Sequence, residues 1–294
     1  MSTFPFCFLE LKNTTTDEKI PYSLIIQEDP HYFIPHRHNY IEFSYVIKGT
    51  GYEIVNNERH SLERGTFSLL LPYQVHALYS DQSDPITFYV GAISLDEFYG
   101  NNAIWRGIAS ILFGDGDEHP AFVNLEGDLV VRMETILHEM FLAYGENTNW
   151  GQLLFKAKLV EALILFDRAR IRNRDLNAEN KKHYTIKKGS FWDVVYHVQT
   201  HYTENISLKE LSLKFHVSVP YISMAFKKHI GDNYLEFLNE IRIQNACALM
   251  VSSELTIAQI AYEVGYESYE TFSRVFLKRK GMSARVYRLN NTYL

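Results

Sequence analysis

The sequence predicts an α+β protein of several domains, with a β-sheet domain first, a pair of helices next and an all-α domain last. Three observations support this prediction. Short runs rich in β-branched and aromatic residues, separated by turn residues, occupy residues 20–98. From residue 125 onward, apolar residues recur every three or four positions, as on one face of a helix. A chain of 294 residues that is 46% apolar can also bury more than one core.

The first domain, residues 1–100, is expected to be a small β-barrel or sandwich. Its clearest predicted strands are separated by glycine, paired asparagines or proline, which favour turns. These strands cover residues 41–47, 51–55, 66–71 and 87–93.

Polar residues recur at even spacing near the start of this domain. His36, His38 and Glu42 would all project to the same face if they lay in one extended strand. With Gly49 they form the pattern H-x-H-x3-E-x6-G, which resembles the first motif of the cupin family, and residues 65–76, ending at His76, resemble the second motif more loosely. The resemblance implies a jelly-roll barrel.

Two hypotheses follow for these polar residues. Three histidines and a carboxylate could hold a divalent transition metal with open positions, as a metal-dependent cupin enzyme would require. Alternatively, the residues form hydrogen bonds with each other or with a small-molecule effector, without metal, cofactor or catalysis. We expect the second; the expected effector-binding residues are His36, His38, Glu42, Tyr45 and His76.

Two helices are expected after the β domain, in residues 101–171. Apolar residues at helical spacing cover residues 125–144 and 150–170, and the glycine and asparagines of residues 145–149 form a turn between them. The resulting antiparallel hairpin could cap the sheet, and it could also pair with its twin in a homodimer. Residues 172–189 are polar and charged, so we expect them to be a linker.

Charge separates the two ends of the chain. Residues 1–180 hold 14 Lys and Arg against 25 Asp and Glu, a net charge of −11. Residues 181–294 hold 15 against 10, a net charge of +5. Because attraction to phosphates is local and screened by salt, this division suggests that only the last part binds a polyanion. Ordinary solvated surfaces would give the same charges.

The sequence also suggests where the protein works. Cys7 and Cys247 fit no metal-ligand spacing and form no disulfide framework, which favours a reducing compartment. The first ten residues lack the features of a signal peptide, and no stretch has the roughly 20 apolar residues that span a bilayer. We therefore expect a soluble cytoplasmic protein with no membrane partner.

An internal repeat of about fifty residues fills the last domain, residues 190–294. Residues 207–211 align with 256–260, and residues 222–231 align with 272–281. Each copy has a hydroxyl residue that can cap a helix, a tight turn, a second helix and a final glycine. Both copies are therefore predicted to be helix-turn-helix units, joined by a long helix over residues 234–251.

The second copy shows why this spacing suits DNA. Ala261 lets the next helix pack closely, and Gly265 can adopt the positive φ of the turn. Phe272 and Phe276 would face the core. The opposite face would then be presented to a major groove; it carries Tyr269, Glu270, Thr271, Arg274 and Lys278. The connecting helix could hold the two recognition helices about one DNA turn, roughly 34 Å, apart.

Residues 257–288 resemble the AraC/XylS family of transcription regulators, and the resemblance extends over residues 190–288. Its hallmarks are Ala261, Gly265, Ser273, Arg274, Phe276, Lys278, Gly281, Tyr287 and Arg288. The sequence has Ala284 where the family usually has proline, Met224 where an arginine is often found, and Ser212 and His216 in the first copy at the positions of Ala261 and Gly265. The resemblance implies a bipartite DNA-binding domain behind a cupin-like sensor, usually without catalysis.

The resemblance also implies double-stranded DNA and a small-molecule effector as partners. Sugars are a common effector class in the family, and Tyr45, Tyr52 and Tyr79 could stack on a sugar ring, although tyrosines are also ordinary strand residues. In the second recognition helix, Arg274 is the best candidate for a bidentate contact to guanine; its alternative role is a salt bridge with Glu270.

Other side chains are expected to assist. Glu270 could accept from cytosine, Thr271 could contact a thymine methyl group, and three lysines could bind phosphates. The remaining expected DNA contacts come from the first copy and the lysines; they are Val219, Pro220, Tyr221, Ser223, Met224, Lys227, Lys228 and Lys278.

Overall fold

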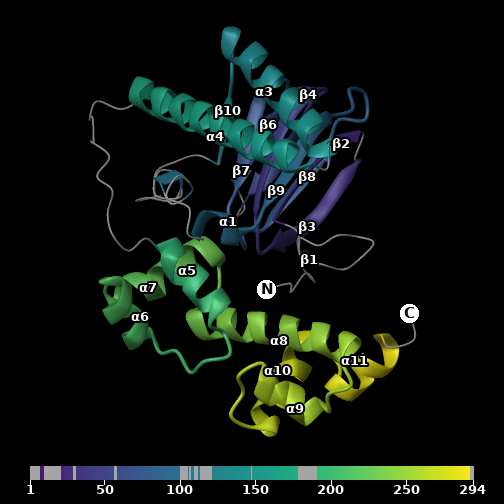
Figure 1. Cartoon of the computed structure of the whole chain (residues 1–294), viewed down its shortest axis with the longest axis vertical. Helices are drawn as coiled ribbons and strands as arrows, with labels where there is room; N and C mark the ends of the chain where they lie inside the picture. Colours follow the sequence, from purple (N-terminus) through teal and green to yellow (C-terminus); the bar gives the residue numbers. More distant parts are fainter. Residues whose placement is uncertain are drawn as a thin grey trace. The chain divides into compact units, whose positions relative to one another are not determined.

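The structure is a computed structural model, and its chain divides into two compact units, Met1–Lys187 and Lys188–Leu294 (Figure 1). It describes residues 7–9, 21–28, 31–55, 58–99, 105, 107–108, 112, 121–146, 148–177 and 191–291, the side chains of 7–9, 99 and 173–177 excepted. The side chain of Cys7 and most of the predicted linker therefore lie outside the described residues. The two units are considered separately.

Two five-stranded sheets form the β part of the first unit. One has the order β1-β3-β8-β5-β6, with bounds β1 Cys7–Leu9, β3 Tyr32–His38, β8 His76–Ser80, β5 Gly51–Val55 and β6 Glu58–Leu62. The other has the order β10-β7-β4-β9-β2, with bounds β10 Phe122–Asn124, β7 Thr66–Leu70, β4 Ile41–Lys48, β9 Thr87–Ile93 and β2 Tyr22–Glu28. The predicted jelly-roll class is confirmed.

The four strands expected from the sequence are present as β4, β5, β7 and β9, each ending within one residue of its predicted bounds. Strands β2, β3, β6 and β8 lie in the region expected to be β but were not delimited from the sequence, and β1 and β10 lie outside that region. Strand β6, with the sequence ERHSL, shows why such strands are hard to delimit from the sequence. Only His60 and Leu62 are buried in it, and the other three side chains face solvent. An antiparallel strand with one solvated face carries too few apolar residues to stand out.

The space between the two sheets is apolar in one part. Val46, Leu78 and Phe88 pack there with Leu62 and Ile86, and all five are buried. Because side chains alternate along a strand, this set comes from inward-facing positions of several strands in both sheets. Polar residues occupy other inward positions and form the cluster described below.

The predicted helical hairpin is present as α3 (Asp128–Gly145) and α4 (Asn149–Asn177). Phe166 of α4 packs on Phe67 of β7, with ring centroids 5.1 Å apart, and Phe155 stacks on Tyr22 of β2 at 4.3 Å. The hairpin therefore covers one face of the β10-β7-β4-β9-β2 sheet (Figure 1). Helix α4 continues to Asn177, six residues into the predicted linker. A short helix α1 (Leu95–Tyr99) follows β9.

The described residues of the second unit, 191–291, form helices joined by turns and contain no strand, as predicted. Its elements are α5 (Phe191–Thr200), α6 (Leu208–Phe215), α7 (Val219–Ala225), η1 (Phe226–Ile230), α8 (Tyr234–Ser252), α9 (Ile257–Glu263), α10 (Tyr269–Lys280) and α11 (Ala284–Asn291). Helices α6 and α7 form the first repeat copy, α9 and α10 form the second, and α8 joins them. In the part of the chain that the structure describes, no helix has the length and apolar character to cross a membrane.

Helix capping is nearly identical in the two copies. Ser207 and Thr256 each accept a hydrogen bond from a backbone N–H three residues on, and Glu210 and Gln259 reach back to complete a capping box. Ser218 and Ser268 cap the recognition helices α7 and α10. The hydroxyl residues predicted as caps are confirmed in this role at 207, 256 and 268.

The tight turns differ in residue type but share a left-handed backbone. Gly265 has φ 91°, and a Cβ at this position would lie 2.5 Å from the carbonyl oxygen of Thr203, so only glycine fits. The first copy places His216 at φ 56° in the corresponding turn. A side chain is tolerated there at a conformational cost of about 1–2 kcal/mol.

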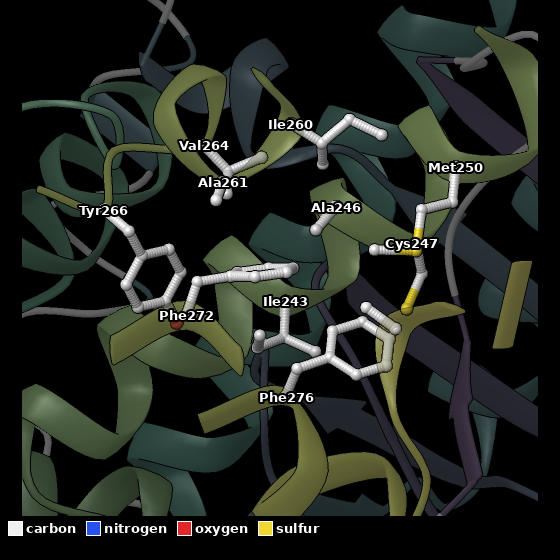
Figure 2. Close-up of a cluster of buried hydrophobic side chains, with 11 residues drawn as sticks. Ile243, Ala246, Cys247, Met250, Ile260, Ala261, Val264, Tyr266, Phe272 and Phe276 are labelled. Atoms are coloured by element: carbon white, nitrogen blue, oxygen red, sulfur yellow. The ribbon is translucent and has the colours of Figure 1, made fainter. Parts of the chain in front are cut away.

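The core of the second copy is built on the connecting helix. Figure 2 shows Phe272 and Phe276 of α10 packed with residues of α8 and α9. Ala261 is fully buried, which confirms its predicted role as the small residue between helices. Helix α11 begins at Ala284, which is also buried. Alanine in place of the family's proline therefore still permits a helix start.

Candidate nucleic-acid interface and interior histidine cluster

The outer face of α10 carries the side chains predicted to meet DNA. Tyr269, Glu270, Thr271 and Arg274 are exposed, whereas Phe272 and Phe276 on the opposite face are fully buried. This division follows from helical spacing, since residues three and four apart share a face. Because Ser268 caps α10, the helix begins at Tyr269, and these residues lie in its N-terminal part. In helix-turn-helix units this part of the recognition helix contacts the bases.

Arg274 is available for recognition. Among residues 191–291 the structure shows no hydrogen bond or ion pair at its guanidinium, and the alternative salt bridge with Glu270 is not formed. Lys278 differs, because its Nζ lies 2.9 Å from Oε1 of Glu236 on α8. Its side chain is still 70% exposed, so the pair is a surface one and leaves the ammonium group accessible to a phosphate.

The first recognition helix changes its winding part of the way along. Helix α7 ends at Ala225, and Phe226–Ile230 form the π-helix η1, which contains Lys227 and Lys228. A π-helix adds one residue to the turn and shifts the following side chains around the axis. Pro220, Tyr221, Ser223 and Met224 are exposed on α7, as are both lysines, but Val219 is half-buried.

Two arginines that the sequence analysis did not single out fix the geometry of this unit. Arg279 of α10 is paired with Glu236 and Glu240 of α8. Arg242 of α8 donates to the carbonyl oxygens of Tyr202 and Glu204 at 2.8 and 2.9 Å. The sequence could have indicated these contacts, because Glu236, Glu240 and Arg242 are charged residues on a connecting helix that is otherwise largely apolar.

The interior polar cluster of the first unit is built from both sheets. His36 of β3 and His76 of β8 are directly paired in register, and Glu42 comes from β4 in the other sheet. The assumption that His36, His38 and Glu42 share one strand is therefore wrong. The chain bends at residues 39–40 between β3 and β4, so the three side chains meet across the barrel rather than along a strand.

The four side chains lie close together. The Nε2 atoms of His38 and His76 lie 3.4 and 3.6 Å from the two carboxylate oxygens of Glu42. His36 and His76 have ring centroids 4.1 Å apart. His38 is fully buried and His76 is 3% exposed. The structure thus brings together four of the five predicted effector-binding residues.

Burial and mutual contact shift the pKa values in this cluster. Burial lowers the pKa of His38 to about 3 and also lowers that of His36. Burial opposes ionisation of Glu42, but the neighbouring imidazoles outweigh it and lower its pKa to about 2. Burial likewise disfavours charge on His76, yet contact with Glu42 raises its pKa. The cluster therefore holds an ionised carboxylate beside two imidazoles whose charged form is disfavoured, His36 and His38, and one whose charged form it favours, His76.

The fifth predicted residue, Tyr45, lies elsewhere. It is three positions from Glu42 in β4, so its side chain projects to the opposite face of the sheet. Its hydroxyl donates to Oε1 of Glu134 on α3 at 3.3 Å, and Arg64 also binds that carboxylate. Tyr45 therefore lies apart from the other four residues predicted to bind the effector, because strand parity places it beneath the helical hairpin.

Tyr52 and Tyr79 also lie outside the cluster. They line a surface groove of about 420 Å³ together with Arg59, Ser61 and Asp81. Their rings stack on each other at 4.7 Å, and Arg59 covers the other face of Tyr52 at 3.6 Å. Both faces of Tyr52 are thus used within the protein, which favours the ordinary structural role over sugar stacking.

A second buried polar pair was missed by the sequence analysis. Nε2 of His60 on β6 lies 3.0 Å from Oε2 of Glu53 on β5, and Oγ of Ser68 lies 3.4 Å from the same nitrogen. The alternation of β6 would have indicated an inward-facing His60 had that strand been predicted.

Comparison with known families agrees with this architecture. Residues 21–162 match the family described as AraC-like ligand binding domain, and residues 211–290 match the one described as helix-turn-helix domain. The fold and the paired DNA-binding units define a transcription regulator with a ligand-binding first domain. The two matched segments are the two domains of an AraC-type transcription regulator.

Its relatives are named as regulators rather than enzymes. The chain is 25% identical over 252 residues to the uncharacterised HTH-type transcriptional regulator YdiP of Escherichia coli, covering 85% of this chain and 78% of that protein. It is 22% identical over 290 residues to the HTH-type transcriptional activator RhaR of Yersinia pseudotuberculosis, covering 95% and 93%. A metal-dependent cupin enzyme is not favoured.

Solved structures of similar proteins include ToxT from Vibrio cholerae. Unsaturated-fatty-acid-bound ToxT is 17% identical, with a TM-score of 0.49, covering 93% of this chain and 96% of that one. The C-terminal domain of AraT from Geobacillus stearothermophilus is 31% identical with a TM-score of 0.33, covering 34% of this chain and 84% of that one.

Proposed function

We propose that this regulator binds DNA through both helix-turn-helix units at once, and that a small molecule in the first unit controls that binding. The observation that carries the proposal is the presence of two capped recognition helices joined by one connecting helix, α8, each with an exposed outer face. The second packs on α8 through Phe272 and Phe276, and the first copy contacts it through Phe226 of η1. Because a rigid connecting helix fixes the distance between the two recognition helices, both can enter neighbouring segments of the major groove of one duplex at the same time.

The base-reading face in this proposal consists of exposed side chains of α10 and α7. Arg274 contacts guanine, and Glu270 and Thr271 contact neighbouring bases. Lys227, Lys228 and Lys278 bind phosphates, while Tyr269 and the exposed α7 residues Pro220, Tyr221, Ser223 and Met224 lie against the groove. Half-buried Val219 contributes by packing at the start of α7.

The effector in this proposal is a sugar or a related polar metabolite that binds at His36, His38, Glu42 and His76. The support is chemical: the cluster offers hydrogen-bond acceptors that the protein does not satisfy, and a polyhydroxylated ligand supplies donors. A ligand that binds one arrangement of the two units more tightly shifts the equilibrium between arrangements and so changes occupancy of DNA.

We propose further that the protein works as a homodimer paired through the α3–α4 hairpin. Apolar side chains remain on the outer side of that hairpin, and Trp150 and Leu153 of α4 are 80% and 59% exposed. Val131 and Leu142 of α3 and Leu154 and Ile164 of α4 are exposed as well. Exposed apolar residues grouped on one element favour a protein interface.

Selection of duplexes from a random pool by the full-length protein, followed by titration at several salt concentrations, tests DNA binding. We expect a preferred sequence whose affinity falls steeply with salt. Repeating the titration with sugars, and with an unsaturated fatty acid as a contrasting ligand, tests the effector class. A sugar should change the affinity of the wild type but not that of His76→Gln, whereas Tyr45→Phe should respond like the wild type.

Sedimentation of wild type and Leu153→Glu tests the dimer. The proposal requires a dimer that the substitution dissociates. A monomeric wild type would contradict it.

A further inference from the structure

The two recognition helices begin alike but carry different chemistry on their exposed side. Ser218 caps α7 and Ser268 caps α10, and each hydroxyl accepts a hydrogen bond from the backbone N–H three residues on. Because both helices start from the same kind of cap, positions at equal distances from the two serines are equivalent. Met224 of α7 therefore occupies the position that Arg274 occupies in α10.

The buried side of each helix supports this equivalence. Ile222 and Phe226 of the first copy are fully buried, and so are the two core phenylalanines at the equivalent positions of α10. Both helices thus turn the same face to the core as far as Phe226. The π-helix η1 changes the winding only from that residue on. Met224 precedes η1, so it is exposed on the face that corresponds to the Arg274 face of α10.

The exposed face of α7 is apolar at positions where α10 carries base-reading groups. Met224 is 66% exposed, and Pro220 stands where α10 has Glu270. The proline ring offers no hydrogen bond and the methionine sulfur is only a weak acceptor, so neither can identify a base edge as arginine or glutamate does. Single exposed apolar residues are common on protein surfaces. These two, however, lie one helical turn apart on one face.

The apolar feature of the major groove is the C5-methyl group of thymine. From this correspondence we infer that α7 recognises thymine through that methyl group, with Met224 as the principal contact and Pro220 beside it. The exposed Lys227 and Lys228 lie in η1, directly after α7, and neighbouring basic side chains favour a polyanionic partner for this face over a protein. Because this names the base feature that one of the two units reads, it rests on the proposed function.

The two units then select bases in different ways. A bidentate contact from Arg274 is directional and discriminates strongly for guanine. A methyl contact is non-directional, and burial of one methyl group raises affinity by only about 4-fold. We therefore expect one half-site with a fixed guanine and one half-site that prefers thymine but tolerates exchange.

The test compares duplexes that differ only in the methyl group, because deoxyuridine has the base-pairing edge of thymine without the methyl. The duplex is the one selected from a random pool by the full-length protein. Its half-site about 10 base pairs from the guanine read by Arg274 should contain thymine. Deoxyuridine there should weaken wild-type binding about 4-fold for each contacted methyl. This measurement needs no variant, so it does not depend on the folding of a substituted protein.

Substitutions assign the effect to one side chain. Met224→Ala should bind the thymine and deoxyuridine duplexes equally, because the partner of the methyl is gone. Met224→Leu keeps an apolar side chain of similar volume and should still prefer thymine. Leu213→Ala is the matched control, because Leu213 is 68% exposed on α6, the other helix of the same copy. It should retain the full effect of deoxyuridine.

Three results would overturn the inference and leave the proposed function in place. They are equal wild-type affinity for the two duplexes, a Met224→Ala variant as sensitive to deoxyuridine as the wild type, and a first half-site without thymine. Failure of the wild type to bind any duplex would instead overturn the proposed function, and the inference with it.

Discussion

Arg279 of α10 forms an ion pair with Glu240 of α8, with Nη1 2.8 Å from Oε2, and both side chains are mostly buried. The same guanidinium also pairs with Glu236 one turn earlier. These contacts fasten the second recognition helix to the helix that joins both units. The neighbouring Lys278 shares Glu236 but faces solvent, so adjacent basic residues have different roles.

Replacement of Arg279 should therefore cost stability, and replacement of Lys278 should cost affinity. We expect Arg279→Met to destabilise the second unit by about 3 kcal/mol, because it removes the mostly buried ion pair with Glu240 and one of the two ion pairs of Glu236. Lys278→Ala should cost less than about 1 kcal/mol of stability. It should, however, reduce the slope of log affinity against log salt concentration by about 1, because one phosphate contact is lost. Urea unfolding and salt-dependent titrations check both, and the reverse pattern would reassign the two residues.

Arg274→Ala should weaken binding to the selected duplex by about 1–3 kcal/mol and relax selectivity at one base pair. The reason is that Arg274 has an exposed guanidinium with no partner in the second unit, and a bidentate contact to guanine is the expected use of such a group. Arg168→Ala, which removes an exposed arginine from α4, is the control for charge. An equal loss on all sequences would make Arg274 a phosphate contact instead.

The two turns should respond in opposite ways to substitution. His216→Gly should stabilise the protein by about 1 kcal/mol, because glycine adopts φ 56° without the penalty of a side chain. Gly265→Ala should be clearly destabilising, since its Cβ would collide with the backbone of Thr203. Hydrogen exchange of residues 191–291 in the full-length protein reports both effects. Destabilisation by His216→Gly would show that the imidazole has a compensating role.

The second unit should lose stability on mild acidification. Burial, reinforced by the charges of His201 and Lys214, lowers the pKa of His197 to about 4. The unfolded chain takes up a proton near pH 6.5 and the folded protein only near pH 4, so stability falls as the pH decreases between these values. Unfolding free energies from pH 7.5 to 4.5 should show a shallower decline for His197→Gln than for wild type. His138→Gln, in the other unit, serves as the control, and identical slopes for wild type and His197→Gln would contradict the assignment.

The helical repeat was predictable in detail because its signals are local. Hydroxyl caps such as Ser207 and Thr256, the small residue Ala261 and the phenylalanines of α10 each act within one or two turns of helix. The barrel was predictable as a class only. Its pairing joins residues distant in sequence, and the bend between His38 and Glu42 places these two residues in strands of different sheets.

The candidate sites divide in the same way. Exposure of Arg274 follows from helical periodicity. The residue pattern indicated that His36, Glu42 and His76 belong to one site. It could not show how they meet, because that depends on the strand register in two sheets. The separation of Tyr45 from the cluster was predictable, because its odd spacing from Glu42 already places it on the other face of the strand. The ion pairs of Arg279 required the packing of α10 on α8.

Methylation interference on the selected duplex tests the central claim most directly, since methylation of guanine N7 blocks contacts in the major groove. We predict two clusters of interference on one face of the duplex, with centres about 10 base pairs apart for one protein chain. Arg274→Ala should remove interference at one guanine in one cluster and leave the other cluster unchanged. A single cluster for each bound chain, or clusters on opposite faces of the duplex, would contradict simultaneous binding by both units.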